Sequence, residues 1–136
     1  MTTQIYEVLY ASVITPGVPF SAIGLIARKS RVSNLADNIT GLLVFDGMRF
    51  SQQLEGGETE VLALLDSIRQ DSRHINFKLL HQGPVAERRF KNFSLAYALM
   101  EDVDVLGRLQ KLKENAAMDA FVALLPTLDL DIQAKN

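Results

Sequence analysis

Apolar and polar positions alternate most regularly in residues 39–56, which read ITGLLVFDGMRFSQQLEG. Alternation with a period of two over runs of this length predicts β-strands. Asp46-Gly47 lies between the two runs and is among the strongest short signals for a tight hairpin turn. The pattern therefore predicts a β-hairpin with Asp46 and Gly47 as its loop, in which Phe45 faces Met48.

One face of this hairpin is apolar apart from a single glutamine. By strand alternation, this face holds Ile39, Gly41, Leu43, Phe45, Met48, Phe50, Gln52 and Leu54. An amide in an apolar wall needs hydrogen-bond partners, or it costs roughly 1–3 kcal/mol. The predicted register pairs Gln52 with Gly41, so that the amide lies beside a space without a side chain. This arrangement indicates either a flat ligand with polar edges or a glutamine bonded to nearby backbone.

The remaining chain alternates strand-like and helix-like stretches. Strand patterns cover residues 5–12, 75–82 and 93–99, and helical spacing of apolar residues covers 20–35 and 58–70. We expect Gly83-Pro84 to end the strand at 75–82, before a charged connection. This order predicts a ferredoxin-like α+β fold, a mixed sheet of about five strands with both helices on one face.

The C-terminal part of the chain carries two further apolar stripes at helical spacing. They are formed by Val105, Leu106, Leu109 and Leu112, and by Phe121, Val122, Leu124 and Leu125. The second face of the predicted sheet needs a cover. We therefore expect residues 101–136 to form a helical cap on that face, a docking surface for another protein, or both.

Composition and charge are those of an ordinary globular domain. The chain has 136 residues, of which 48% are hydrophobic and 22% charged, with a net charge of −2. Such a balance gives no bulk attraction to nucleic acid or to an anionic membrane. The sequence has no cysteine, its start lacks the features of a signal peptide, and no apolar run approaches the roughly 18 residues of a membrane span. We expect a small cytoplasmic protein.

The sequence nominates no enzyme chemistry. His74 and His81 are too few and too isolated for a metal site. The motifs of zinc proteases, phosphate-binding loops, dinucleotide-binding folds and serine hydrolases do not occur. Acidic residues fall on predicted surfaces, where carboxylates are mostly solvated. We therefore expect neither a metal centre nor a hydrolytic site.

Three other function classes share this predicted topology. An acylphosphatase-like hydrolase would need an arginine and an asparagine near the first strand–helix loop, where Thr15-Pro16-Gly17 offers neither. An interaction module would need no ligand site at all. An RNA-recognition module would show exposed aromatic residues among basic ones, whereas Phe45 and Phe50 share the apolar face of the hairpin.

Several short motifs in a fixed order carry a resemblance to a known family. They are LYAS at 9–12, Asn34 seven residues before Gly41, QQLEG at 52–56, DSRH at 71–74 and GPVAERRF at 83–90. In this order and spacing the chain resembles the BLUF family of flavin-based blue-light sensors, from about Tyr6 to Leu99. The resemblance implies a photosensor domain over residues 1–100 and a C-terminal extension over 101–136. It further implies non-covalent FAD, with FMN as the alternative, held between the two helices.

The resemblance also implies a set of site residues. The flavin-binding positions are Tyr10, Ile26, Ser30, Asn34, Gln52, Ile68, Arg73 and His74. In this family, light lets the tyrosine give an electron while a proton passes through the glutamine, which is left rotated or tautomerised. Asn34 would bond the ring edge, and Arg73 and His74 would lie near the phosphate-bearing tail. The residues alone leave simpler interpretations open: a half-buried strand tyrosine, a helix C-cap at Asn34 and a solvated corner at Arg73-His74.

The chain departs from the family at the last predicted strand. Many members carry a tryptophan followed two residues later by a methionine, and here these positions are Phe93 and Leu95. Leu95 has no hydrogen-bond acceptor, unlike a methionine sulfur, so the way in which these two residues relay the signal is altered. The resemblance implies a sensor without its own enzyme activity, a separate downstream signalling protein and a homo-oligomer.

Overall fold

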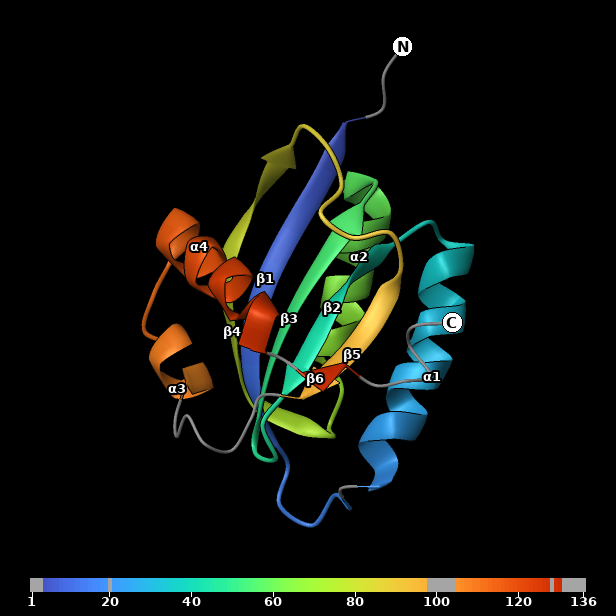
Figure 1. Ribbon diagram of the computed structural model, residues 1–136. Coiled ribbons are helices and arrows are strands. Elements are labelled where there is room, and N and C mark those ends of the chain that lie inside the picture. The colour runs from blue at the N-terminus through green and yellow to red at the C-terminus, as the bar shows by residue number, and fades with distance from the viewer. Residues whose placement is uncertain (1–3, 20, 98–104, 128, 131–136) are drawn as a thin grey trace.

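The computed structural model describes residues 4–19, 21–97, 105–127 and 129–130 (Figure 1). The elements are β1 (Ile5–Ile14), α1 (Ser21–Ala36), β2 (Thr40–Phe45), β3 (Arg49–Gly56), α2 (Glu58–Arg69), β4 (His74–Val85), β5 (Phe93–Tyr97), α3 (Val105–Leu109), α4 (Glu114–Leu124), the short 3-10 helix η1 (Leu125–Thr127) and β6 (Asp129–Leu130). The predicted end of the last strand, residues 98–99, lies outside the described residues.

The strands form one mixed sheet in the order β4-β1-β3-β2-β5-β6. Neighbours are antiparallel except for β2 and β5, which run parallel. Helices α1 and α2 lie on one face of the sheet, and α3 and α4 lie on the other (Figure 1). The predicted ferredoxin-like α+β fold with a C-terminal cap is confirmed, with the two-residue β6 added at the edge.

Strand alternation divides the apolar residues into two cores, one on each face of the sheet. In β1, Val8 and Tyr10 belong to the core under α1 and α2, whereas Leu9 and Ala11 belong to the core under α3 and α4. Each face is therefore covered by its own helices, as the period of two in a strand requires. The two cores are separated by a single layer of backbone.

The hairpin register is offset by two residues from the predicted one. Phe45 pairs with Phe50, and Gln52 pairs with Leu43. An offset of two leaves each side chain on its own face because strand alternation has a period of two. The apolar face around Gln52 is therefore preserved, although the predicted partners across the hairpin are wrong.

The side chain of Asp46 accounts for this offset. Its Oδ1 accepts hydrogen bonds from the backbone N–H of Met48 at 2.9 Å and of Arg49 at 2.6 Å. Asp46 thus closes the hairpin, and Gly47 and Met48 form the loop. Gly47 has a φ of 99°, which suits glycine in the first position of a two-residue hairpin loop. Met48 is 54% exposed, so the prediction that it faces Phe45 on the apolar face is wrong.

Gly41 lies beside Leu54 and Gln53, and not opposite Gln52 as predicted. It pairs with Leu54, and a Cβ built on it would lie only 2.0 Å from the carbonyl oxygen of Gln53. Glycine at this position therefore allows β2 to approach the backbone of Gln53 closely. The predicted vacancy beside Gln52 is wrong.

Strand β4 continues through Gly83-Pro84, which was predicted to end it. Pro84 pairs with Tyr6 of β1. Because β4 is the outer strand of the sheet, a proline there can lack its N–H without removing a ladder hydrogen bond. Edge position explains why the sequence signal for a stop fails.

The cap buries residues from both predicted apolar stripes. Its buried residues are Leu106 and Leu109 of α3 and Ala117, Met118 and Phe121 of α4, packed on Leu9, Ala11, Leu42, Val44, Leu80 and Ala96 of the sheet. The buried members of the stripes therefore serve the intramolecular cap.

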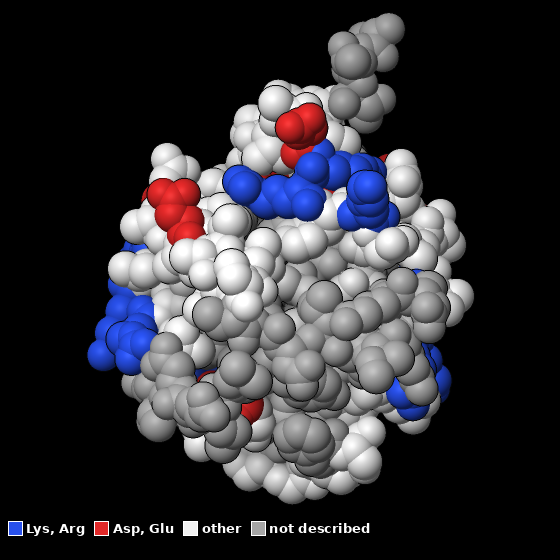
Figure 2. Space-filling view, viewed as in Figure 1, with Lys and Arg blue, Asp and Glu red and all other residues white. Residues whose placement is uncertain are grey.

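Charged side chains of both signs lie at the rim of the cap side of the molecule. On the face seen in Figure 2, Lys and Arg side chains lie around the edge, with acidic side chains beside those at the upper edge. Among the described residues, no helix is both long enough and apolar enough to cross a membrane.

Candidate functional site

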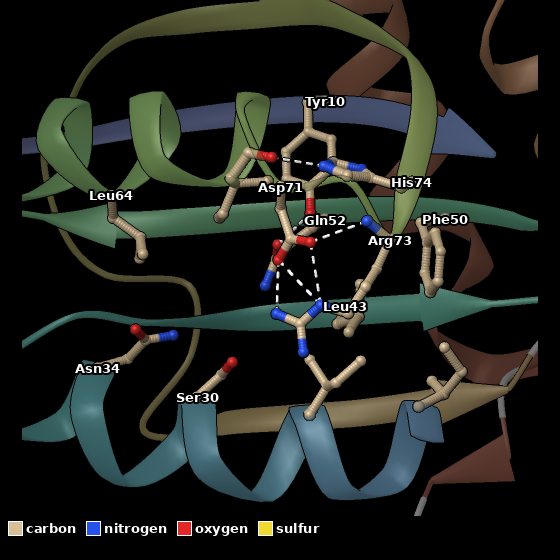
Figure 3. Close-up of a pocket in the computed structure, with 13 residues that line it drawn as sticks. Tyr10, Ser30, Asn34, Leu43, Phe50, Gln52, Leu64, Asp71, Arg73 and His74 are labelled. Atoms are coloured by element: carbon tan, nitrogen blue, oxygen red, sulfur yellow. Dashed lines mark hydrogen bonds and ion pairs between the residues drawn. The ribbon is translucent and has the colours of Figure 1, made fainter. Parts of the chain in front are cut away.

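A cavity of about 110 Å³ opens between α1 and α2, over the central strands of the sheet (Figure 3). It is lined by Tyr10, Ile23, Ile26, Ser30, Asn34, Leu43, Phe50, Gln52, Leu64, Ile68, Asp71, Arg73 and His74. All of the positions for which the sequence predicted flavin contacts lie in this lining. Residues that are up to 64 positions apart in the sequence, such as Tyr10 and His74, thus meet in one place.

Helix α1 supplies one wall through a single stripe of side chains. Ile23, Ser30 and Asn34 follow each other at helical spacing and face the cavity, together with Ile26. Asn34 is only 4% exposed, and its side-chain amide makes no hydrogen bond to any residue that the structure describes. The amide points into the cavity (Figure 3), so the alternative interpretation of Asn34 as a helix C-cap is wrong.

Helix α2 supplies the opposite wall. It begins after Gly57, and two glutamates in its first turn suit the positive end of the helix dipole. Val61 and Leu65 are buried against the sheet, and the neighbouring positions Leu64 and Ile68 line the cavity. The amphipathic pattern of α2 therefore places two aliphatic side chains opposite those of α1.

A buried pair of polar residues, Tyr10 and Gln52, forms the floor of the cavity. The two residues face each other on β1 and β3, and the Tyr10 hydroxyl donates a hydrogen bond of 2.5 Å to Oε1 of Gln52. Each is only 4% exposed. Within the described residues, the amide nitrogen of Gln52 makes no hydrogen bond. Burial, reinforced by the negative charge of Asp71, raises the pKa of Tyr10 well above its usual value, so the phenol is neutral near pH 7.

Aromatic contacts fix the ring of Tyr10. Phe77 stacks on it, with ring centroids 4.9 Å apart and planes at 22°, and His74 meets it at 6.1 Å. Nε2 of His74 lies 2.5 Å from the Ile68 carbonyl, which can only accept, and Nδ1 lies 2.8 Å from Oγ of Ser12. Both nitrogens of His74 are therefore engaged within the protein, so His74 supports the Tyr10 ring. Strand alternation places Phe77 on this face, but no sequence pattern indicates that it stacks on Tyr10.

An ion pair lies at the mouth of the cavity. Arg73 donates to Asp71 through Nε at 2.9 and 3.1 Å and through Nη2 at 2.5 Å, and the guanidinium lies between the two helices (Figure 3). These hydrogen bonds are the main reason why the pKa of Asp71 is lowered and that of Arg73 raised. The Arg73 side chain is 53% exposed. The Thr15 hydroxyl donates to the Ser72 carbonyl at 2.6 Å and ties this corner to the end of β1.

Five lining residues were not predicted as site residues: Ile23, Leu43, Phe50, Leu64 and Asp71. The first four share a helix stripe or a strand face with predicted site residues, so periodicity could have identified them. Asp71 lies within the DSRH motif, but a charged corner is usually solvated, and only the fold brings it to the cavity.

Phe93 and Leu95, the predicted relay residues, lie in the core on this side of the sheet but outside the cavity lining. Leu95 pairs with Leu43 of β2, and Leu43 pairs in turn with Gln52. One strand therefore separates Leu95 from the Tyr10–Gln52 pair.

The lining fits a flat ligand with polar edges and an anionic tail. Its walls are mostly aliphatic. The side-chain amide of Asn34 and the amide nitrogen of Gln52, neither with a partner among the described residues, offer polar groups that a buried ring edge could use. Arg73 at the mouth offers a guanidinium for a phosphate. Among the described residues, no group of three or more His, Asp or Glu is placed to hold a metal ion.

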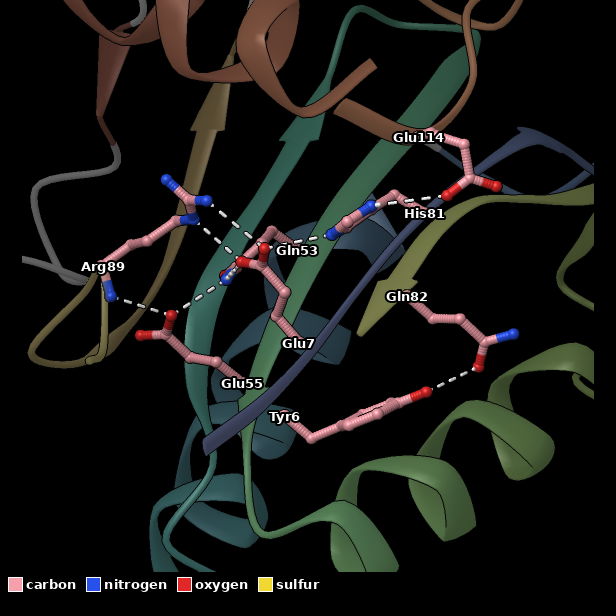
Figure 4. Close-up of polar contacts among 8 residues, drawn as sticks. All are labelled: Tyr6, Glu7, Gln53, Glu55, His81, Gln82, Arg89 and Glu114. Atoms are coloured by element: carbon pink, nitrogen blue, oxygen red, sulfur yellow. Dashed lines mark hydrogen bonds and ion pairs between the residues drawn. The ribbon is translucent and has the colours of Figure 1, made fainter. Parts of the chain in front are cut away.

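A second polar cluster lies on the opposite face of the sheet (Figure 4). Glu7 is 1% exposed and Glu55 is fully buried, so the prediction that acidic residues lie on solvated surfaces is wrong for these two. Gln53, the neighbour of Gln52, donates to both carboxylates. Strand alternation already indicated that Glu7 is buried, because it places Glu7 on the same face as the apolar Leu9.

Comparisons with known proteins agree with this geometry. Residues 5–96 match the family model described as BLUF, sensors of blue-light using FAD. The chain is 34% identical over 82 residues to the blue light- and temperature-regulated antirepressor BluF of Escherichia coli, covering 60% of this chain and 20% of that protein. It is 31% identical over 117 residues to the photoactivated adenylate cyclase subunit beta of Euglena gracilis, covering 80% of this chain and 14% of that protein. The chain thus spans a fifth or less of the length of these relatives.

Solved structures give the same result. The dark-state structure of BlrB, a BLUF protein, superposes with a TM-score of 0.67 at 28% identity, covering 82% of this chain and 85% of that chain. Klebsiella pneumoniae BlrP1 with FMN and cyclic diGMP superposes with a TM-score of 0.65 at 28% identity, covering 79% of this chain and 29% of that one. From its sequence match, its fold and the lining of its cavity, the chain belongs to the BLUF family of flavin-dependent blue-light sensors.

Proposed function

We propose that this chain senses blue light through a flavin in the cavity between α1 and α2, with Tyr10 and Gln52 as the switch. The observation that carries the proposal is the buried hydrogen bond of 2.5 Å from the Tyr10 hydroxyl to Oε1 of Gln52, at the cavity floor. A flavin bound there would absorb blue light and act as a strong oxidant for a moment. The proton transfer and the change of hydrogen bonds would be carried out by Tyr10 and Gln52.

Tyr10 supplies an electron and a proton, and both return to it. The phenol is neutral in the dark because burial raises its pKa. When Tyr10 loses an electron its hydroxyl becomes a strong acid, and the Oε1 of Gln52 is the acceptor already in place. The protonated amide can turn or tautomerise before the electron and proton go back to Tyr10. The net change is the hydrogen-bond pattern of Gln52, since an amide is both donor and acceptor.

Other lining residues would hold the ligand. The free amide of Asn34 can bond the polar edge of the ring, with Ser30 beside it, while Ile26 and Ile68 cover its faces. Arg73 can bond a phosphate of the tail if it shares its guanidinium with Asp71. We propose FAD as the natural cofactor because the family description names it; one related structure contains FMN.

The proposed output is a conformational signal to another protein. Relatives of this chain are named as an antirepressor and as cyclase subunits, which supports regulation of an effector. We propose that this chain carries no enzyme activity of its own and acts on a separate downstream protein. A homo-oligomer stays a prediction.

An absorption spectrum of the purified chain, reconstituted with FAD, tests the proposal. We expect flavin bands that move slightly to the red under blue light and return in darkness. A chain that binds no flavin, or whose bands do not move reversibly, would contradict it. Repeating the experiment with FMN and with riboflavin determines which flavin the cavity retains.

A further inference from the structure

The buried cluster behind Gln52 connects the switch strand to the cap. Gln53 is fully buried and its Nε2 donates to Oε1 of Glu7 at 3.2 Å and to Oε1 of Glu55 at 2.9 Å (Figure 4). Its Oε1 is buried without a hydrogen-bond partner in the described part of the chain. Turning this amide over would place an oxygen against two carboxylates, so Gln53 has one acceptable orientation.

Glu7 also connects this cluster to β4, the outer strand of the sheet. Its carboxylate also accepts hydrogen bonds from Nε of Arg89 at 2.8 Å and from Nε2 of His81 at 3.1 Å. His81 lies on β4, at the edge of the sheet, against which α4 packs. Glu7 therefore joins β1, β3, β4 and the segment before β5 at one buried point.

The second nitrogen of His81 faces the first residue of α4. Nδ1 is buried, has no hydrogen-bond partner among the described residues, and lies 3.9 Å from Oε2 of Glu114. Glu114 has a φ of 55°, a left-handed conformation that glutamate seldom adopts. His81 therefore lies between two carboxylates, with Nε2 on Glu7 and Nδ1 facing Glu114.

We propose that Gln53, Glu7 and His81 form a relay that carries the change at Gln52 through the sheet to Glu114 at the start of α4. The relay rests on the function proposed above. Gln52 and Gln53 are consecutive on β3, and each bonds a residue of β1, Tyr10 on one face and Glu7 on the other. A change in the Tyr10–Gln52 bond alters the fit of β1 against β3, and the rigidly oriented Gln53 transfers that change to Glu7. The hydrogen bond between His81 and Glu7 then sets the position of the ring beside Glu114.

Hydrogen exchange under light and in darkness tests the relay in the full chain with bound FAD. Backbone exchange of residues 114–124 is measured by mass spectrometry for the wild type, Glu114→Gln and His81→Gln. Glu87→Gln is the matched control, because it removes an exposed carboxylate outside the cluster. Glu114 is 78% exposed, so its variant is expected to fold even if the His81 variant does not. The light-induced spectral shift of each protein is recorded in the same samples.

We expect light to change exchange in α4 of the wild type and of Glu87→Gln. In Glu114→Gln and His81→Gln this light–dark difference should shrink by about fivefold, the lower end of usual coupling strengths, while the spectral shift stays. The relay would be overturned if the light–dark difference in α4 exchange were equal in all four proteins. It would also be overturned if the wild type showed no such difference despite a normal spectral shift. Loss of the spectral shift in the wild type would overturn the proposed function, and the relay with it.

Discussion

Gln52 and Gln53 are chemically identical neighbours on β3, yet their surroundings differ sharply. Gln52 faces the cavity, accepts a hydrogen bond from Tyr10, and has an amide nitrogen without a partner among the described residues. Gln53 faces the cap and donates to two buried carboxylates. The first amide can exchange donor for acceptor at small cost, whereas the second is held in one orientation by charge. One strand thus carries a movable amide and a fixed one, back to back.

The two amides differ in how strongly their hydrogen bonds hold them, because the partner of Gln52 is neutral and the partners of Gln53 are charged. A hydrogen bond to a charged group is worth about 1.5–3 kcal/mol, against about 1 kcal/mol for a neutral pair. The weaker contact is the one that light can rearrange, and the stronger contact keeps the strand in place while this happens.

Removing either member of the movable pair should abolish the lasting spectral shift. Tyr10→Phe removes the electron and proton donor, and Gln52→Leu removes the amide that turns. Both variants should still bind flavin, because walls of the cavity such as Ile26 and Ile68 remain. Absorption spectra before and after blue light measure the effect, with Leu64→Met as a control that changes the lining on α2, away from the strands that carry the pair. A retained reversible shift in either variant would contradict the assignment.

Removing the fixed amide should destabilise the fold more than removing the movable one. Gln53→Leu takes two hydrogen bonds from buried Glu7 and Glu55, which we expect to cost about 3 kcal/mol of unfolding free energy. Gln52→Leu leaves only the Tyr10 hydroxyl without a partner, at about 1 kcal/mol. Urea unfolding of the two variants without flavin gives the comparison. Equal losses would show that the cluster on the cap side is no stronger than the pair in the cavity.

The cap-side cluster should weaken in acid. Burial works to raise the pKa of Glu7, but hydrogen bonds from Arg89 and Gln53 and the charge of Arg89 leave it below the ordinary value of 4.5. A carboxylate with a lowered folded-state pKa stabilises the fold above its unfolded pKa and loses that contribution as pH falls through the folded value.

The wild type should therefore lose stability relative to Glu7→Gln from about pH 5 downwards. Thermal unfolding over a pH series measures this difference, with Glu87→Gln as the control for an exposed glutamate. A gap between wild type and Glu7→Gln that stays constant down to the acid limit would mean that Glu7 gains nothing from its partners.

The ion pair at the mouth should have the smallest effect. Asp71→Asn frees Arg73 for a phosphate, and Arg73→Gln removes that contact. Because Arg73 is half exposed, we expect FMN affinity to rise and fall, respectively, by about fivefold. Riboflavin, which lacks the phosphate, is the matched control ligand and should bind all three proteins alike in a fluorescence titration. Equal changes for riboflavin and FMN would place the phosphate elsewhere.

Most of the fold could be predicted from local pattern, and the errors have local causes. Periodicity identified the strands and both faces of the hairpin. The predicted hairpin register was wrong because the Asp46 side chain bonds the backbone N–H groups of Met48 and Arg49 and closes the turn. The sequence Asp46-Gly47 is equally compatible with a loop made of these two residues. The prediction that Gly83-Pro84 ends the strand was wrong because β4 is at the edge of the sheet. This position is known only once the sheet is assembled.

The site divides in the same way. Tyr10, Asn34 and Gln52 were identified by family resemblance and by the oddity of one amide on an apolar face. Glu7 and Glu55 were missed because a buried carboxylate depends on partners far away in the sequence: Arg89 lies 82 residues from Glu7. Alternation places Glu7 on one face with Leu9, but it does not reveal these distant partners. Asp71 was missed because only the fold brings its corner to the mouth of the cavity.

The most direct test is NMR of the side-chain amides of Gln52 and Gln53 in darkness and under blue light, with flavin bound and both residues assigned. We predict that the Gln52 NH₂ signals move strongly under light, while those of Gln53 stay close to their dark positions and remain protected from solvent exchange. Gln52 signals that stay in place while the flavin bands shift would contradict it.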